Sequence, residues 1–154
     1  WSQVAAARGR GLTIYAAILG SPTRAKRNSD LAELLAWGLA QFRVVPAVST
    51  ERIYARARLP YGKAPLRLVA EKRLLKVVRV REPLVERVVA PASLQLPVRK
   101  GQRLGQVQIF AGEKLLGTRA LVAAESVEKP GLASRVGFYA GETLSNVWSM
   151  LSLT

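Results

Sequence analysis

Short apolar runs recur at regular spacing through the middle of the chain, and this pattern limits the fold more than any other feature. Ile53, Ala55, Ala57 and Leu59 alternate with polar side chains, which is the period of a half-buried β-strand. Pro60-Tyr61-Gly62 then supplies a turn. Further runs follow at residues 66–70, 74–80, 84–90, 106–110 and 115–121, with Gly101, Gly105 and Gly112 between them. Such spacing predicts a small all-β sandwich or barrel.

Two β-prone runs open the chain, Trp1–Ala7 and Leu12–Leu19, joined by Arg8-Gly9-Arg10-Gly11. They predict a β-hairpin with a glycine-containing loop. The longest apolar run of the chain lies within Leu12–Leu19. It is far short of the roughly 20 residues that a bilayer-spanning helix needs, so no transmembrane helix is expected. The sequence at Trp1 has neither an initiator Met nor a signal-peptide pattern, and we expect the chain to be a fragment of a longer protein.

A helix is expected after Pro22, with Asn28, Ser29 or Asp30 as its N-cap. Apolar residues at helical spacing predict the face that this helix turns inward: Leu31, Leu34, Leu35, Gly38, Leu39 and Phe42. From Arg43 the apolar period changes from 3.6 to two. We therefore expect a domain boundary near residues 43–50.

Residues 131–154 return to the helical period. Polar residues such as Ser134 and Glu142 share one side, and Trp148 lies near the border. The other side is an apolar stripe: Leu132, Val136, Tyr139, Ala140, Thr143, Val147, Met150 and Leu151. Gly137 and Gly141 each weaken a helix by about 1 kcal/mol relative to Ala, so this amphipathic helix is expected to need a surface on which to form.

The chain has no cysteine and no histidine. This excludes disulfides, Cys/His metal sites, thiol nucleophiles and the Ser-His-Asp arrangement. No paired carboxylates stand at catalytic spacing. Any chemistry would have to rest on carboxylates, Lys or Ser; we expect no catalytic, cofactor-binding or metal-binding residue and no cofactor.

The formal net charge of +14 is unevenly distributed. Residues 43–103 contain fifteen Lys and Arg against four Glu, which predicts a basic face and an anionic neighbour such as nucleic acid, anionic lipid or an acidic wall polymer. Most of the basic residues are Arg, and a GC-rich genome also produces such an excess of Arg over Lys. Only Tyr54 and Tyr61 could stack bases in this range, so nucleic acid is the less favoured partner. These residues by themselves indicate a basic binding module.

Gly20-Ser21-Pro22 follows an apolar run and precedes the helix, as phosphate-binding loops do. It lacks the further glycines and the Gly-Lys-Ser/Thr ending that would wrap a phosphate. An ordinary strand-to-helix connection is the favoured interpretation.

Two long segments resemble the serine D-alanyl-D-alanine carboxypeptidases, the low-molecular-mass penicillin-binding proteins. AAILGSPTRAKRNSDLAELLAWGLAQF, residues 16–42, resembles the hairpin strand and helix that close their transpeptidase-like domain. LQLPVRKGQRLGQVQIFAGEKLLGTRALVAAESVEKPG, residues 94–131, resembles their β-rich C-terminal domain. The resemblance implies a closing fragment of that α/β domain at residues 1–42, an all-β accessory domain at 43–130 and a terminal amphipathic helix at 131–154.

The resemblance also implies what this chain does and lacks. The Lys-Thr-Gly strand would lie about a dozen residues before Trp1, with the S-x-x-K and S-x-N motifs further upstream, so the chain is expected to lack all three motifs and the nucleophile. The parent would remove the terminal D-Ala from peptidoglycan stem peptides. This chain would act as its non-catalytic scaffold, packed against the missing catalytic domain or a second copy.

The resemblance places the terminal helix on the outer face of the bacterial cytoplasmic membrane. The implied location is extracytoplasmic, and the residues expected to face the membrane are Leu132, Val136, Tyr139, Val147, Trp148 and Met150. The alternative is an independent basic β-module that binds nucleic acid or another polyanion. That alternative leaves the hairpin and helix ahead of the β domain unexplained.

Overall fold

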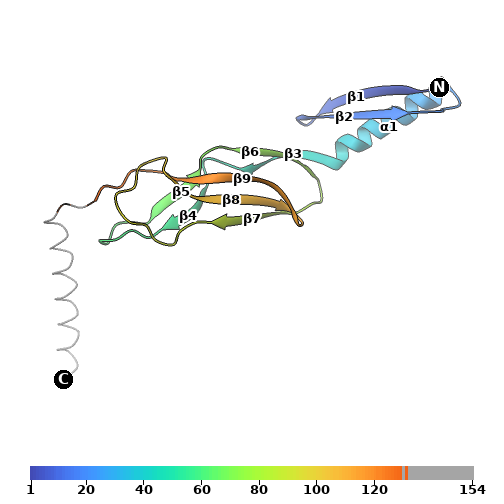
Figure 1. The fold of residues 1–154 in the computed structure, drawn as a ribbon. Coiled ribbons are helices and arrows are strands. Elements are labelled where there is room, and N and C mark those ends of the chain that lie inside the picture. Colours follow the sequence, from blue (N-terminus) through green and yellow to red (C-terminus); the bar gives the residue numbers. More distant parts are fainter. Residues whose placement is uncertain (130, 132–154) are drawn as a thin grey trace. The chain divides into compact units, whose positions relative to one another are not determined.

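The computed structural model describes residues 1–129 and 131. Strands predominate, and one helix lies among the described residues, so the expected mainly β fold is confirmed (Figure 1). The chain divides into two compact units. The first contains Trp1–Ser49, Arg73–Arg87 and Gln108–Gly117, and the second contains the remaining described residues. The one described helix is not long and apolar enough to cross a membrane.

The predicted hairpin is confirmed at the start of the chain. Strands β1 (Gln3–Gly9) and β2 (Leu12–Ile18) pair antiparallel, with Gly9 opposite Leu12. The connection is shorter than expected, because Arg8 and Gly9 belong to β1. Arg10 and Gly11 form the turn with φ values of 53° and 78°, and two successive positive φ values match the right-handed twist of a tight hairpin.

Helix α1 (Arg24–Gln41) begins earlier than the sequence predicted. Its N-cap is Thr23, whose hydroxyl oxygen accepts a hydrogen bond from the Lys26 backbone N–H at 3.1 Å. Asn28, Ser29 and Asp30 lie inside the helix, so the predicted N-cap was wrong. Asn28, Ser29 and Asp30 are good N-cap residues in general, but the helix begins before them, directly after Pro22 and Thr23. Asp30 instead forms an ion pair with Lys26, one turn before it, at 3.1 Å.

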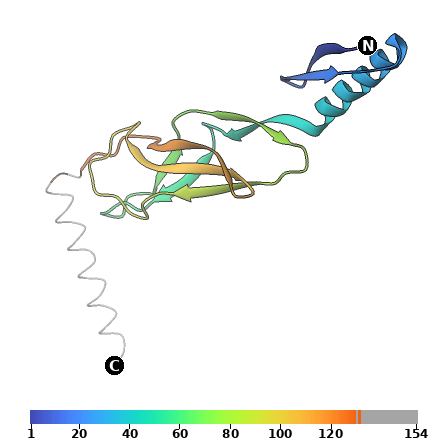
Figure 2. The same ribbon diagram turned by 45° about the vertical axis from the view of Figure 1, so that its right-hand side comes forward.

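Helix α1 lies along one face of the hairpin in both ribbon views (Figures 1 and 2). Leu31 and Gly38 are buried there, while Leu35 is half-buried. Gly38 permits this approach, because a Cβ added to it would lie 3.0 Å from the Cγ2 atom of Ile14. Leu34 was predicted to point inward but is 40% exposed, since a single hairpin covers a narrower stripe than a full sheet.

Replacing Gly38 should loosen the packing of the helix on the hairpin. We expect Gly38→Leu to lower the unfolding free energy of the first unit by about 2 kcal/mol, because the side chain would overlap Ile14. Ala36→Leu, on the exposed side of the same helix, should change it by less than about 0.5 kcal/mol. Urea titration followed by Trp fluorescence compares the two. Equal midpoints would show that the close approach is not needed.

Strand β3 (Phe42–Val48) follows α1 with no intervening loop, where the strand period was expected to begin, although no separate strand was predicted at these residues. It pairs antiparallel with β6 (Leu74–Arg79), with an irregularity between Pro46 and Val48. Pro46 breaks the apparent strand pattern, yet it is tolerated in this two-stranded sheet because one side of β3 carries no ladder. The Val80 N–H donates to the Gln41 carbonyl at 2.9 Å and so ties the end of β6 to the end of α1.

The remaining strands form a five-stranded sheet in the order β4-β5-β9-β8-β7. They are β4 (Ile53–Ala57), β5 (Leu66–Ala70), β7 (Leu84–Val89), β8 (Arg103–Ala111) and β9 (Lys114–Ala123). Five of the six apolar runs of the sequence pattern overlap one of them, and the sixth, at residues 74–80, overlaps β6. The fully buried side chains come from these strands and their neighbours: Leu66, Leu68, Ile109, Leu121, Val48, Val98 and Val107. Alternating burial along β5 is what the period of two predicted.

Candidate functional site

The connection at Gly20-Ser21-Pro22 has its polar groups satisfied within the chain. The Ser21 N–H donates to the Trp1 carbonyl at 2.9 Å, and the Ser21 hydroxyl donates to the Thr23 carbonyl at 3.3 Å. Ser21 itself is buried. The segment joins β2 to α1, which is the strand-to-helix connection that the sequence predicted.

The spacing S-x-x-K does occur once, at Ser126-Val127-Glu128-Lys129, so the expectation that the chain lacks this spacing was wrong. The geometry is unsuited to catalysis. Val127 is half-buried and bridged to Val98, while Ser126, Glu128 and Lys129 are exposed, and the Ser126 hydroxyl oxygen accepts from the Lys100 N–H at 2.9 Å. Residues three apart share a face on a helix but point to opposite faces of an extended chain. Lys129 therefore cannot activate Ser126, because a catalytic base must reach its nucleophile.

The outer face of the hairpin, defined here as Val4, Ala6, Tyr15, Ala17 and Leu19, is apolar and exposed. Val4 is 70% exposed, Tyr15 76% and Leu19 80%. The opposite face of the same ribbon packs on α1, where Ile14 and Ile18 are half-buried. Within the described residues, neither β1 nor β2 has a second strand beside it. Such a bare apolar face on a two-stranded ribbon is typical of a surface that a partner covers.

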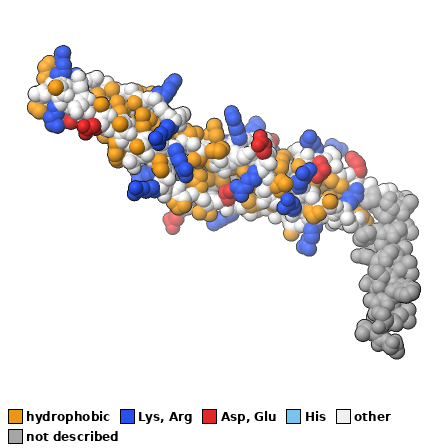
Figure 3. Space-filling view, turned by 180° about the vertical axis from the view of Figure 1, so that it is seen from behind, with side chains coloured by type: hydrophobic (Ala, Val, Ile, Leu, Met, Phe, Trp, Pro, Cys, Tyr) orange, Lys and Arg blue, Asp and Glu red, His pale blue; other side chains and the backbone are white. Residues whose placement is uncertain are grey.

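Basic side chains are dispersed over the face shown in Figure 3, with acidic ones among them. Several are partly neutralised: Arg103 pairs with Glu71 at 2.9 Å and Arg67 with Glu125 at 3.6 Å. Both tyrosines of residues 43–103 are half-buried, and the Arg52 guanidinium lies 5.1 Å from the Tyr54 ring centroid. This range therefore offers no row of exposed rings on which bases could stack.

The basic turn, defined here as residues 97–102, projects two exposed cations, Arg99 and Lys100. Together with Pro97, Gly101 and Gln102 of the same turn, these two residues line an open depression. Gly101 has a φ of 80°, a conformation that favours glycine, and no atom lies within 4 Å of where its Cβ would be. The Gln102 N–H closes the turn on the Arg99 carbonyl at 3.0 Å. The sequence marked this turn only through the family resemblance.

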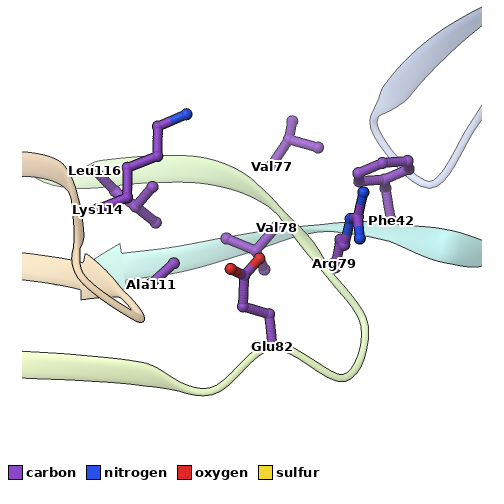
Figure 4. Close-up of a pocket in the computed structure, with 8 residues that line it drawn as sticks. All are labelled: Phe42, Val77, Val78, Arg79, Glu82, Ala111, Lys114 and Leu116. Carbon is purple, nitrogen blue, oxygen red and sulfur yellow. The ribbon is translucent and has the colours of Figure 1, made fainter.

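A small cavity of ≈ 190 Å³ lies in the first unit (Figure 4). Its lining is largely apolar and includes Phe42, Val77 and Leu116. Arg79, Glu82 and Lys114 also line it, but in Figure 4 they extend from different segments without converging on one point. Among the described residues, no group of three Asp or Glu side chains is placed to hold a metal ion. The cavity therefore has no arrangement of groups that would orient a charged ligand.

The residues expected to face a membrane are Leu132, Val136, Tyr139, Val147, Trp148 and Met150. All six lie outside the described residues.

Two curated relatives align with most of the chain. It is 25% identical over 130 residues to the D-alanyl-D-alanine carboxypeptidase DacD of Salmonella typhimurium, a match that covers 82% of this chain and 33% of the relative. It is 26% identical over 145 residues to the D-alanyl-D-alanine carboxypeptidase DacC of Escherichia coli, covering 88% and 35%. The chain thus spans about a third of the length of both relatives.

A solved structure has the same fold. Penicillin-binding protein 5 from Haemophilus influenzae superposes with a TM-score of 0.55 at 22% identity, over 83% of this chain and 39% of that one. The sequence model of the family described as "Penicillin-binding protein 5, C-terminal domain" matches residues 44–129, more than half of the chain. The resemblance to the D-alanyl-D-alanine carboxypeptidases is confirmed by these matches, and the chain belongs to the penicillin-binding protein 5 C-terminal domain family.

Proposed function

We propose that this chain is the non-catalytic scaffold and membrane-proximal positioning part of a D-alanyl-D-alanine carboxypeptidase that acts in peptidoglycan maturation. The single observation that supports it most is the match of residues 44–129 to the penicillin-binding protein 5 C-terminal domain, preceded by a hairpin and helix. The parent would cleave the terminal D-Ala of stem peptides in an upstream catalytic domain. The two relatives are named for that activity.

The hairpin and helix would complete the catalytic domain. Residues 1–42 would be its closing fragment, residues 43–130 the accessory domain and residues 131–154 the terminal helix. The bare outer face of the hairpin supports this division, because layers of an α/β domain cover both faces of a sheet and leave no apolar face exposed. The upstream domain, and not a second copy, is the proposed cover.

The terminal residues would hold the parent at the outer face of the cytoplasmic membrane. The proposed contacts are apolar, through Leu132, Val136, Tyr139, Val147, Trp148 and Met150. An aromatic ring such as that of Trp148 suits the headgroup region. The protein would thus act extracytoplasmically, on stem peptides at a set height above the bilayer.

Tyr15→Lys tests the proposed cover of the hairpin. In the chain of residues 1–154, the side chain is 76% exposed, so we expect a change in unfolding free energy below about 0.5 kcal/mol. In the parent protein, which carries the upstream residues, the lysine would be buried without a partner. There we expect a loss of about 3 kcal/mol in the stability of the catalytic domain, seen as a lower urea midpoint.

Ala64→Lys is the matched control, because Ala64 is exposed in the loop between β4 and β5. It should be neutral in both proteins. A neutral Tyr15→Lys in the parent would contradict the proposal, since the outer face would then stay open when the catalytic domain is present.

A further inference from the structure

Two buried side chains, at the start of the basic turn and just before it, hold it on the core. Leu96 and Val98 are 8% and 2% exposed, while Pro97 and Arg99 between and beside them point outward. This alternation is that of an extended segment with one face in the core. The charges of Arg99 and Lys100 are therefore carried on a fixed part of the second unit and not on a loose loop.

Every backbone donor of residues 99–102 is already used. The Arg99 N–H donates to the Gln102 Oε1 atom at 3.1 Å, and the Lys100 N–H to the Ser126 Oγ atom at 2.9 Å. The Gly101 N–H donates to the Ala123 carbonyl at 2.9 Å, and the Gln102 N–H to the Arg99 carbonyl at 3.0 Å. An anion at this turn would meet side chains only. That suits an extended anionic surface better than a single enclosed anion, which is normally held by backbone N–H groups.

The two cations of the turn are not neutralised within the described part of the chain, where neither Arg99 nor Lys100 has an ion pair. The carboxylate of Glu125, on the neighbouring segment, is taken by Arg67 at 3.6 Å. Lys129 on that same segment adds a positive charge, and Glu128 offsets one. The local surplus is positive.

The turn lies beside the segment that leads to residue 130. The Val98 N–H donates to the Val127 carbonyl at 3.0 Å, and the Val127 N–H donates to the Val98 carbonyl at 2.8 Å. Residues 97–102 and 127–129, the last described residues before position 130, therefore lie side by side in the second unit. A surface that received the terminal segment would meet Arg99 and Lys100 as well.

We infer that Arg99 and Lys100 contact the phosphates of anionic lipid headgroups where the terminal segment meets the membrane. The inference rests on the proposed function, because it takes the terminal residues as the anchor. The turn adds what the anchor lacks, since residues 131–154 carry Arg135 and Glu142 and so have no net charge. Nucleic acid is disfavoured as the partner, because residues 97–103 include no aromatic ring for stacking.

The test is co-sedimentation of the 1–154 chain with two kinds of vesicle. One kind contains equal parts of phosphatidylglycerol and phosphatidylcholine, and the other contains phosphatidylcholine only. At low salt, Arg99→Gln/Lys100→Gln should bind the anionic vesicles about 10- to 30-fold more weakly than the unaltered chain, as expected for two cations at a charged surface. Binding to the neutral vesicles should not change.

Arg81→Gln/Lys114→Gln is the matched control, because it removes the same charge from two exposed residues of the first unit. It should reduce anionic-vesicle binding by less than about 3-fold, since neither residue belongs to the turn that makes the proposed contact. Circular dichroism confirms that both double variants keep their strands. Equal binding of the two double variants to anionic vesicles would overturn the inference. So would a turn variant that binds anionic vesicles like the unaltered chain and loses only its binding to a single-stranded oligonucleotide.

A chain ending at Pro130 separates this inference from the proposed anchor. If it binds neutral vesicles as well as the 1–154 chain does, the anchor is wrong. If it loses that binding while the turn variant binds anionic vesicles like the unaltered chain, the anchor stands and the role of Arg99 and Lys100 is refuted.

Discussion

Gly105→Ala is expected to destabilise the second unit by about 3 kcal/mol, roughly a hundredfold in its folding equilibrium. A Cβ at residue 105 would lie 2.5 Å from the Val89 carbonyl oxygen and 3.1 Å from the Cα atom of Ala90. Backbone atoms of a paired strand cannot turn aside as the end of a side chain can. Strand β7 would have to separate from β8 at this end, and ladder hydrogen bonds would be lost with it.

Gly117→Ala is the control for this prediction. Gly117 is also a strand glycine, in β9, but its Cβ would meet the Leu74 Cδ2 atom at 3.1 Å, and that methyl group is the end of a flexible side chain. We expect a change below about 1 kcal/mol, helped by the lower backbone entropy of Ala in the unfolded chain. Urea denaturation followed by circular dichroism measures both. Equal midpoints would mean that the sheet yields at Gly105 as easily as at Gly117.

The strands of the β part could be predicted because each one follows local rules. Leu66–Ala70 was predicted with the bounds that β5 has, since its alternating side chains meet a core on one face. β3 could not be predicted in the same way. Its sequence contains Pro46, and only its position in a two-stranded sheet makes that residue acceptable.

The errors at α1 have a similar origin. Asn28, Ser29 and Asp30 are as good as Thr23 in intrinsic capping preference. Thr23 is the N-cap because the helix starts immediately after Pro22. Leu34 fits the apolar stripe by spacing, but the width of the surface beneath the helix decides its burial. The burial of Leu34 thus depends on the hairpin, whose residues are distant in sequence.

The site was less predictable than the fold. The hairpin and helix were assigned by resemblance, while the exposure of Tyr15 on the face opposite α1 required the register of β1 and β2. The basic turn is only a charged loop in the sequence. Two of its backbone N–H groups bind Ser126 and Ala123, which are distant in sequence, so the sequence could not show that these donors are occupied.

We expect the largest difference between this chain and the proposed parent in catalysis. A serine that opens a β-lactam needs a base within hydrogen-bonding reach, and residues three apart in an extended segment, as Ser126 and Lys129 are, face opposite ways. Loss of such a base typically slows the reaction by about 10⁴-fold or more. The 1–154 chain should therefore neither form a β-lactam adduct nor release D-Ala from a D-Ala-D-Ala peptide.

Labelling with a fluorescent β-lactam tests the central claim most directly. The samples are the 1–154 chain, its Ser126→Ala variant, and the parent protein that includes the residues encoded before Trp1. We expect stoichiometric labelling of the proposed parent at a serine upstream of Trp1, and no labelling of either shorter protein. A label on Ser126 that the Ser126→Ala variant loses, or a parent that takes up no label, would contradict it.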